Sequence, residues 1–321
     1  MNSAMTLATR LVADIGGTNS RLALYDSARD EFRALRTYIN RDYAEFEDVV
    51  ADWMQRLDEA PPAQACIAVA APLEGDHITM VNMDWSFSRS GLAERFQLQA
   101  SGWINDFESN AYSLPFLGEQ DRKVIYPGRP GACQRLAVVG PGTGLGGATV
   151  EPVRGAYHAT PCEPGHMGLS PQSEEELALF RLLLTRHRDI FAELLISGPG
   201  LQRLYQTLAE LRGEQASASS PAEVTRRALA GEEALCSDAL GHFCALLGSA
   251  CGDFVLATGS YGGLYLAGGI APRIADFLMQ SRFMVRFQQK GAMDNHLGTV
   301  PVLLITTPQP GLIGAAHAPL D

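Results

Sequence analysis

Three glycine-rich segments follow short apolar stretches, and their residue types suit the binding of phosphate groups. They are Asp14–Arg21, Gly140–Gly147 and Ala267–Pro272. Glycine lets a backbone approach a ligand closely and turn its N–H groups toward phosphate oxygens. Thr18 and Thr143 can each add a hydroxyl donor. Taken singly, each segment is as well explained by an ordinary tight turn, but the three together favour the binding of a nucleotide's phosphates.

Two familiar nucleotide motifs are excluded. No G-x-x-x-x-G-K-[ST] sequence of the P-loop type occurs. The run Gly142–Gly147 is expected to open a strand, whereas the dinucleotide-binding fingerprint opens a helix. Asp14, at the end of its apolar stretch, could hold a hydrated Mg²⁺ beside the phosphates.

The elements around the first turn predict a mixed sheet. Leu11–Ile15 and Arg21–Tyr25 read as two strands joined by the turn, and a third strand is expected near Ala34–Ile39. A helix follows, because apolar residues recur with helical spacing from Phe46 to Leu57. Its N-terminus is expected to form a capping box, with Asp42 as the cap and Glu45 as its partner.

The order of elements then alternates. Strands are expected at Cys66–Ala70 and Ser101–Ile104, with a helical stretch near Arg89–Phe96 between them. The first third therefore reads β-β-β-α-β-α-β, which predicts a mixed sheet with helices on its faces.

The strand, glycine turn and strand recur in the second part of the chain. Strands are expected at Leu136–Val139 and Ala148–Val150, and later at Gly263–Ala267 and Val300–Ile305. Two helices are expected after the caps Ser173 and Ser220, each with a glutamate three residues on, and the first of them should bury Leu177, Phe180 and Leu184. A long helix should run from Glu232 toward Phe254.

Composition bounds the class of protein. The 321 residues carry a net charge of −11 at pH 7, which argues against a general nucleic-acid or anionic-membrane binder. No stretch approaches the ~20 consecutive apolar residues of a membrane span, and no secretory signal is visible at the start, where Met1 or Met5 could begin the protein. The six cysteines form no C-x-x-C pair and are expected to be reduced core residues.

The three turns, in this order and between these strands, resemble the phosphate-1, phosphate-2 and adenosine segments of the sugar kinase, Hsp70 and actin superfamily. Within it the chain resembles the bacterial glucokinases of the hexokinase-like group over essentially its full length. The residues that carry this resemblance are Asp14–Arg21, Ala70–Asp76, Asn82 with Trp85, Ile104–Phe107, Gly140–Ala148, Pro161–His166, Ser173–Glu176, Ser197–Leu201, Leu266–Pro272 and Pro310–Gly314.

The resemblance implies an α/β fold of two ribonuclease-H-like (actin-like ATPase) lobes with mixed sheets around a central cleft. The small lobe is expected to comprise residues 1–110 and 306–321, and the large lobe residues 111–305. The implied activity is transfer of the γ-phosphate of ATP to the 6-hydroxyl of glucose. It implies ATP and Mg²⁺ as cofactors, a cytoplasmic location and a homodimer, with no nucleic-acid or membrane partner.

The resemblance also assigns roles to single residues. Asp106 is implied as the catalytic base, and the sugar-binding set is Asn105, Asp106, Glu163, His166 and Glu193. The nucleotide-binding set is Asp14, Ile15, Gly16, Gly17, Thr18, Asn19, Gly142, Thr143, Gly144, Gly268 and Gly269. Asp14 is also implied as the Mg²⁺ ligand, through water or phosphate. Without the resemblance, Asn105 with Asp106 would read as a helix cap and Glu193 as a surface glutamate.

Two positions depart from the family pattern. Cys162 and Pro164 stand where the family usually has glycine, so the loop Pro161–His166 is stiffer and its hexose preference is open. The alternatives are a kinase of another hexose or amino sugar, a sugar-binding regulator without activity, and a nucleotide-binding structural protein of the actin type. A coupled assay across several sugars separates them.

Overall fold

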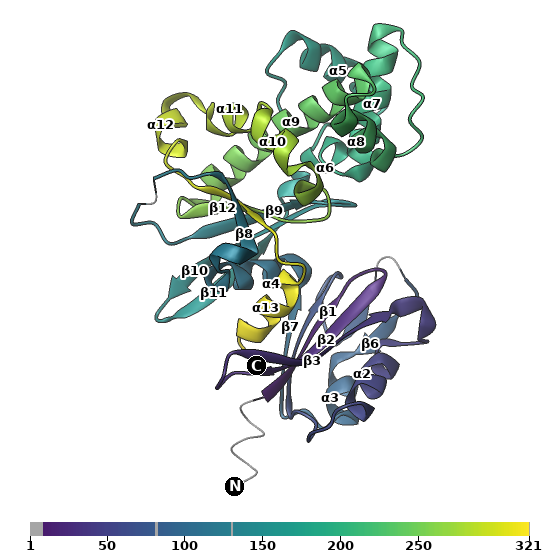
Figure 1. The fold of residues 1–321 in the computed structure, drawn as a ribbon, viewed down its shortest axis with the longest axis vertical. Helices are drawn as coiled ribbons and strands as arrows, with labels where there is room; N and C mark the ends of the chain where they lie inside the picture. Colours follow the sequence, from purple (N-terminus) through teal and green to yellow (C-terminus); the bar gives the residue numbers. More distant parts are fainter. Residues whose placement is uncertain (1–8, 81–82, 130, 321) are drawn as a thin grey trace. The chain divides into compact units, whose positions relative to one another are not determined.

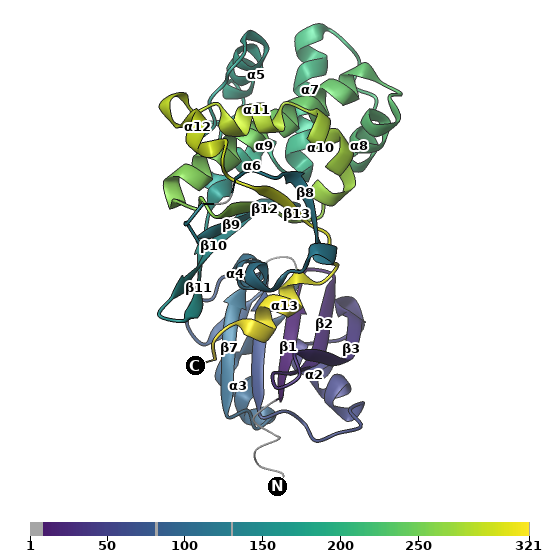
Figure 2. The same cartoon turned by 60° about the vertical axis from the view of Figure 1, so that its left-hand side comes forward.

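The computed structural model describes residues 9–320 except 81, 82 and 130. The chain packs into two compact units, each with its own sheet and core (Figures 1 and 2). Unit 1 comprises Met1–Leu117, Val153–Pro161 and Pro308–Asp321, and unit 2 comprises Gly118–Pro152 and Cys162–Thr307. The sequence predicted lobes that meet at residues 110/111 and 305/306, and these lobe boundaries remain a prediction. The compact units change over at 117/118 and 307/308, and residues 153–161 group with unit 1.

The sheet of unit 1 has five strands in the order β3-β2-β1-β4-β7. Strand β1 pairs antiparallel with β2 and parallel with β4, so the sheet is mixed, as the element order predicted. The inner strands are apolar along nearly their whole length because both faces of the sheet are covered. The strands are β1 (Thr9–Ile15), β2 (Asn19–Asp26), β3 (Glu31–Ile39), β4 (Gln64–Val69) and β7 (Ala100–Asn105), with a small hairpin of β5 (His77–Thr79) and β6 (Ser86–Ser88).

Helices cover the two faces of this sheet. Leu11, Ala13 and Ile15 of β1 belong to one core cluster with the buried residues of α2 (Phe46–Gln55) and α3 (Arg89–Arg95). Side chains alternate along a strand, so Asp14 points to the opposite face, where α13 (Pro310–His317) packs beside α4 (Asp106–Ser113) (Figure 2). Short 3₁₀ turns lie at η1 (Asn40–Asp42) and η2 (Leu114–Phe116).

The predicted capping box of α2 is wrong. The residue at the N-cap is Glu45, and its side chain makes no capping hydrogen bond. It is paired with Arg95 instead, at 3.1 Å. Asp42 lies in the 3₁₀ turn η1, which leads into an extended Tyr43, so it cannot reach the first turn of the helix.

The sheet of unit 2 has six strands in the order β11-β10-β9-β12-β13-β8. Strand β12 pairs parallel with both β9 and β13, while β10 and β8 run antiparallel at either side, so this sheet is mixed as well. The strands are β8 (Arg122–Tyr126), β9 (Leu136–Pro141), β10 (Leu145–Val153), β11 (Ala156–Cys162), β12 (Gly263–Leu266) and β13 (Val302–Ile305).

The helices of unit 2 pack around one long apolar helix. This helix, α9 (Ala234–Thr258), is near the expected range, and most of its side chains are buried. The others are α5 (Glu174–Leu184), α6 (Ala192–Leu195), α7 (Gly198–Arg212), α8 (Pro221–Ala230), α10 (Ala275–Gln280), α11 (Phe283–Gln288) and α12 (Asp294–Leu297), with 3₁₀ turns η3 (Glu119–Asp121), η4 (Pro164–His166), η5 (Ala271–Ile274) and η6 (Gly291–Met293).

Two of the predicted helix caps are confirmed, and one set of predicted core residues is partly wrong. The side chains of Ser173 and Ser220 accept the backbone N–H three residues on, at the starts of α5 and α8. In α5, however, Leu184 is exposed, and the core side is formed by Leu179, Phe180 and Leu183. The buried face of α5 is therefore turned around the helix axis relative to the predicted one.

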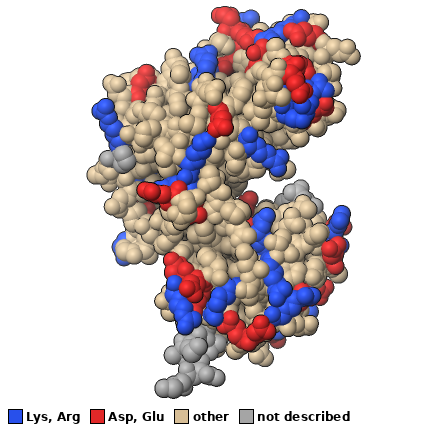
Figure 3. Space-filling model, viewed as in Figure 1, with Lys and Arg blue, Asp and Glu red and all other residues tan. Residues whose placement is uncertain are grey.

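Helix α9 is long and apolar enough to cross a membrane by length and composition alone. In the most apolar 18-residue stretch of α9, 78% of the residues are buried inside unit 2, as is typical of a helix that forms the core of a domain. Three of the six cysteines lie on this helix, and all three are buried as predicted, as is Cys66, whereas Cys133 and Cys162 are half-buried. On the face shown in Figure 3, Lys and Arg side chains lie among Asp and Glu side chains.

Candidate functional site

The first glycine turn connects β1 to β2 in unit 1. Gly16 N donates to Asn19 O at 3.0 Å, which closes the turn, and Gly17 and Thr18 at its tip are exposed. Ile15 contributes only backbone here. Its side chain is fully buried in the core, and its carbonyl accepts Ala70 N at 3.1 Å. The turn therefore presents backbone and one hydroxyl to solvent, which suits the binding of an anion.

Asp14 lies beside this turn, on the face of the sheet that α13 covers. It pairs in register with Arg21 of β2, and their side chains are 3.5 Å apart. Burial raises the pKa of Asp14, and the charge of Arg21 opposes this shift. A Cβ on Gly311, in the first turn of α13, would lie 2.9 Å from the carboxyl carbon of Asp14. Glycine at this position therefore lets the carboxylate approach the positive end of the helix.

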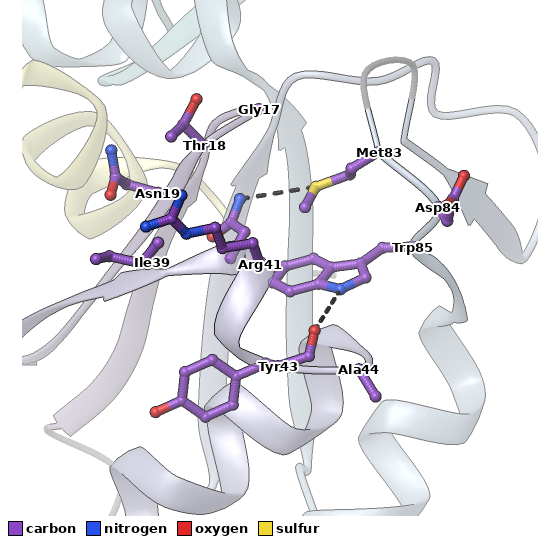
Figure 4. Close-up of a pocket in the computed structure, with 11 residues that line it drawn as sticks. Gly17, Thr18, Asn19, Ile39, Arg41, Tyr43, Ala44, Met83, Asp84 and Trp85 are labelled. Carbon is purple, nitrogen blue, oxygen red and sulfur yellow. Dashed lines mark hydrogen bonds between the residues drawn. The ribbon is translucent and has the colours of Figure 1, made fainter.

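A cavity of about 620 Å³ opens next to the first turn, and all the residues that line it belong to unit 1. Gly17, Thr18 and Asn19 form one wall, and the rings of Tyr43 and Trp85 lie across from them (Figure 4). Trp85 Nε1 donates to Tyr43 O at 3.4 Å, which ties the two aromatic residues together. Asn82, which also carried the family resemblance, lies outside the described residues.

Asn105 and Asp106 stand where β7 passes into α4. Asn105 Oδ1 accepts Glu108 N at 2.5 Å, and Glu108 Oε2 accepts Asn105 N at 3.3 Å, which forms a complete capping box. Asp106 is the first residue of the helix and is half-buried. The cap fixes the direction in which α4 leaves the sheet, and so the position of the Asp106 carboxylate at the positive end of α4.

One contact joins the Asp14 and Asp106 regions within unit 1. Ser109 Oγ of α4 donates to the carbonyl of Gly311 in α13 at 2.6 Å. Gly311 thus lies close to Asp14 because it has no side chain, and its carbonyl binds α4. Sequence reasoning missed this link between α13 and α4.

In unit 2 the second and third glycine turns lie against each other. Ala267 N donates to Val139 O at 2.9 Å, and Ile270 N donates to Pro141 O at 3.3 Å. Gly268 has φ +78°, and a Cβ on it would lie 2.5 Å from Pro141 O. No other residue type fits at Gly268 without displacing the second turn, so glycine here serves close packing as well as access. Gly142, Thr143 and Gly269 remain accessible at this edge.

The predicted sugar loop and Glu193 come together through a short antiparallel bridge. Residues Gly168 and Phe191 pair across it, and Ala192 N donates to Met167 O at 2.8 Å. This bridge joins the chain just after Glu163 and His166 to the chain just before Glu193. Glu163 and His166 are both exposed, and Glu193 is half-buried in α6.

Glu193 also holds the second glycine turn. Its Oε2 accepts Leu145 N at 2.8 Å, and both Gly144 and Gly165 are packed so closely that an added Cβ would crowd this carboxylate. One side chain therefore contacts the predicted nucleotide turn and the predicted sugar loop. Pro164, the departure from the family pattern, packs over Gly147, which has room for it only because it lacks a side chain.

The structure thus gathers the predicted residues into two sets, one in each unit. Unit 1 contains Asp14, Ile15, Gly16, Gly17, Thr18, Asn19, Asn105 and Asp106, and unit 2 contains Gly142, Thr143, Gly144, Glu163, His166, Glu193, Gly268 and Gly269. Three residues that support them were not predicted, namely Asn40, Glu108 and Gly311. Of these, only Glu108 had a local signal, because it stands three residues after an Asn cap.

Comparison with known proteins places this geometry in a family. The family model described as Glucokinase matches residues 11–320. A glucokinase from Chromobacterium violaceum is 39% identical over 309 residues, covering 96% of this chain and 88% of the relative. One from Colwellia psychrerythraea is 37% identical over 321 residues, covering 98% and 97%. A crystal structure of glucokinase from an Antarctic psychrotroph, 36% identical, matches with a TM-score of 0.89 over 97% of this chain and 98% of that chain. This likeness confirms the predicted fold class.

Proposed function

The chain belongs to the glucokinase family, and from this premise we propose that it transfers the γ-phosphate of ATP to the 6-hydroxyl of glucose, giving glucose 6-phosphate and ADP. The observation that carries the proposal is the position of Glu193. Its carboxylate contacts the second glycine turn through Leu145 N and packs on Gly165 of the sugar loop. A sugar and a phosphate donor bound at these two segments would therefore be neighbours, as phosphoryl transfer requires.

In unit 2 we assign the nucleotide to the second and third turns and the sugar to the loop beside them. Gly142, Thr143, Gly144, Gly268 and Gly269 would line the nucleotide with their backbone, and the N–H of Gly142 closes the turn by donating to Gly144 O at 2.8 Å. The exposed side chains of Glu163 and His166, with Glu193, offer the donors and acceptors that sugar hydroxyls need.

In unit 1 we assign the first turn, Gly16–Asn19, to the phosphates and Asp106 to proton transfer, with Asn105 beside it as a sugar ligand. In the reaction, the O6–P bond forms as the bond from the γ-phosphorus to the leaving ADP oxygen breaks. Asp106 accepts the proton of the 6-hydroxyl. Its place at the capped start of α4 supports this role, because the capping box holds the carboxylate on a rigid element.

The residues around Asp14 fit a Mg²⁺ ion held mainly by phosphates. Mg²⁺ is usually bound through one or two carboxylates, with water and substrate phosphates completing its octahedron. Asp14 offers one such carboxylate beside the first turn, and among residues 9–320, as far as they are described, no three His, Cys, Asp or Glu side chains form a cage of their own. When bound, the ion would neutralise charge on the phosphates. Asp14 would orient it, and the charge of Arg21 opposes the rise that burial causes in the pKa of that carboxyl.

The test is a coupled assay with glucose and Mg·ATP on the wild type and on Asp106→Asn. We expect kcat to fall by roughly 10²–10⁴-fold, the usual contribution of a general base, while the KM for glucose stays within a few-fold. Asp276→Asn is the matched control, because Asp276 is an exposed aspartate paired with Lys123 and should leave kcat unchanged. A kcat for Asp106→Asn close to that of the wild type would contradict the assignment.

The stiffer loop Pro161–His166 favours a second candidate, a kinase of another hexose or amino sugar. Assays with mannose, fructose and N-acetylglucosamine, at equal concentration with glucose, decide between them by kcat/KM. We also propose a cytoplasmic homodimer on the strength of the family, and light scattering of the purified protein measures its oligomeric state.

A further inference from the structure

We propose that Asn40 is a positioning residue for the first glycine turn, and that it sets the affinity for the nucleotide through the orientation of that turn. This inference rests on the proposed function, in which Gly16–Asn19 receives the phosphates. Asn40 begins the 3₁₀ turn η1, directly after β3, and only 1% of it is exposed. A polar side chain so deeply buried must have its hydrogen bonds satisfied within the protein.

Three of the hydrogen bonds of Asn40 go to the first turn or its edge. Its Nδ2 donates to Gly16 O at 2.8 Å, and its backbone N donates to Thr18 O at 2.9 Å. Its Oδ1 accepts the hydroxyl of Ser20, which is also fully buried, at 2.8 Å. The residue therefore holds the turn at Gly16, Thr18 and Ser20, on every second residue.

These contacts determine where the N–H groups of the turn point. The peptide unit is planar and trans, so the N–H that follows a carbonyl points the opposite way. Because Asn40 holds the carbonyls of Gly16 and Thr18, the N–H groups of Gly17 and Asn19 are directed away from it. Those two residues also line the cavity beside the turn (Figure 4). A preorganised donor binds an anion more tightly than one that must first be ordered.

Asn40 also connects the turn to the loop that carries the aromatic wall of the cavity. Its Nδ2 lies 3.6 Å from Met83 Sδ, the contact drawn as a dashed line in Figure 4. Met83 and Trp85 stand on the same loop, and both line the cavity with Gly17 and Thr18. A side chain with both a donor and an acceptor is needed at this position. An aspartate would turn a charged oxygen toward the carbonyl of Gly16.

The experiment compares full-length wild type with Asn40→Ala and Asn40→Asp by steady-state kinetics with glucose and Mg·ATP. We expect the KM for ATP to rise about 10-fold, the equivalent of ~1.4 kcal/mol. The KM for glucose should stay within twofold. Thr207→Val is the matched control, because it removes another buried side-chain hydrogen bond, Thr207 Oγ1 to Arg203 O at 2.7 Å, in helix α7 of unit 2. It should lower Tm and leave the KM for ATP unchanged.

A purely structural role would lower Tm in the Asn40 variants as in the control, with the KM for ATP within twofold of wild type. That result would overturn the inference and leave the proposed function standing. If the wild type phosphorylates no glucose, the proposed function fails instead, and calorimetric titration of Mg·ADP into wild type and Asn40→Ala then decides the positioning role. Should neither Asn40 variant fold, Ser20→Ala replaces them, with an expected rise of two- to threefold in the KM for ATP, roughly one weakened hydrogen bond. An unchanged value there would equally overturn the inference.

Discussion

The first glycine turn of unit 1 and the second glycine turn of unit 2 have similar sequences but are held in different ways. A neutral amide, Asn40, supports the first turn by binding its carbonyls. A carboxylate, Glu193, supports the second by accepting Leu145 N. In the first turn the protein binds backbone carbonyls, so the backbone N–H groups that follow them point outward. In the second turn one backbone N–H, that of Leu145, is itself bonded to the protein.

The glycines of the two turns serve different purposes as a result. A Cβ on Gly16 would meet Asn19 O at an ordinary distance of 3.5 Å. A Cβ on Gly144 would collide with Glu193, and one on Gly268 would lie 2.5 Å from Pro141 O. Packing therefore requires glycine at Gly144 of the second turn and at Gly268 of the neighbouring third turn, but not at Gly142, whose added Cβ would meet no atom of the described residues within 4 Å. In unit 1 packing alone does not require it at Gly16, and its value there lies in access to a ligand.

The same contrast extends to the interiors of the two units. Unit 2 buries an ion pair, Arg286 with Glu176, at 2.6 Å, with 0% and 2% of the side chains exposed. His242 lies beside it, with Nδ1 3.8 Å from Glu176. At the first turn of unit 1, the fully buried polar pair is the neutral Ser20 and Asn40, and the charged pair Asp14 and Arg21 beside it keeps 20% and 34% of its side chains exposed. We therefore expect unit 2 to be sensitive to charge, and the first turn of unit 1 to be sensitive to the loss of neutral hydrogen bonds.

The largest effect should come from Glu176→Gln. It leaves the buried Arg286 without its counter-charge, and breaking a buried pair in this way typically costs about 3–5 kcal/mol. Glu174→Gln, two residues earlier in the same helix and exposed, is the matched control and should change stability little. Urea unfolding at pH 7 measures both. Equal midpoints for the two variants would remove the contrast between the units.

The ion pair of Glu176 and Arg286 should also make the stability of the wild type depend on pH in the acid range. Burial raises the pKa of Glu176, but hydrogen bonds from His242, Arg286 and Gln172 N outweigh it and bring the pKa to about 2. The pKa of Glu176 in the folded protein lies below the ordinary 4.5. The contribution of this carboxylate to the stability of the fold is therefore complete above pH 4.5 and is lost as the pH falls toward 2. Between pH 5 and 3, as an order-of-magnitude window, wild type should lose more stability than Glu176→Gln. Parallel losses would contradict the assignment.

The next largest effect should separate two neighbouring glycines of the third turn. Gly268→Ala imposes a left-handed backbone on alanine, at about 1–2 kcal/mol, and adds the clash with Pro141 O, so we expect ~2–3 kcal/mol in total. Gly269→Ala is the control, because no heavy atom of the described residues lies within 4 Å of its added Cβ. Thermal unfolding compares them. A Tm for Gly268→Ala equal to that of Gly269→Ala would show that packing does not require the glycine.

Local patterns predicted much of the fold and long-range contacts decided the rest. The caps Ser173 and Ser220 could be predicted because a cap and its partner lie within four residues of each other. The pair Asp42 and Glu45 has the same local pattern but fails, because β3 runs into a 3₁₀ turn that moves the helix start to Phe46. Local spacing cannot reveal that competition.

In the candidate site, too, residues with a local sequence signal could be predicted, and residues that act through long-range contacts could not. The glycine turns stood out because glycine clusters after apolar stretches, and Asn105 because it follows one. The second role of Glu193 was not visible, since it joins residues 48 apart in the chain. Asn40 and Gly311 act on partners brought close only by the sheet and by α13, so no spacing in the sequence marks them.

The smallest effect should come from Ser20→Ala, which tests whether the first turn depends on neutral hydrogen bonds. The change leaves Asn40 Oδ1 buried without its donor, at a cost of about 1 kcal/mol. Ser170→Ala, on the surface of unit 2, is the control and should cost nothing measurable. In the Asn40→Ala background the oxygen is already gone, so Ser20→Ala should cost clearly less there than in wild type. Equal costs in both backgrounds would mean that the two side chains act independently. The support of the first turn would then come from the contacts of Asn40 to Gly16 O and Thr18 O, without a contribution from Ser20.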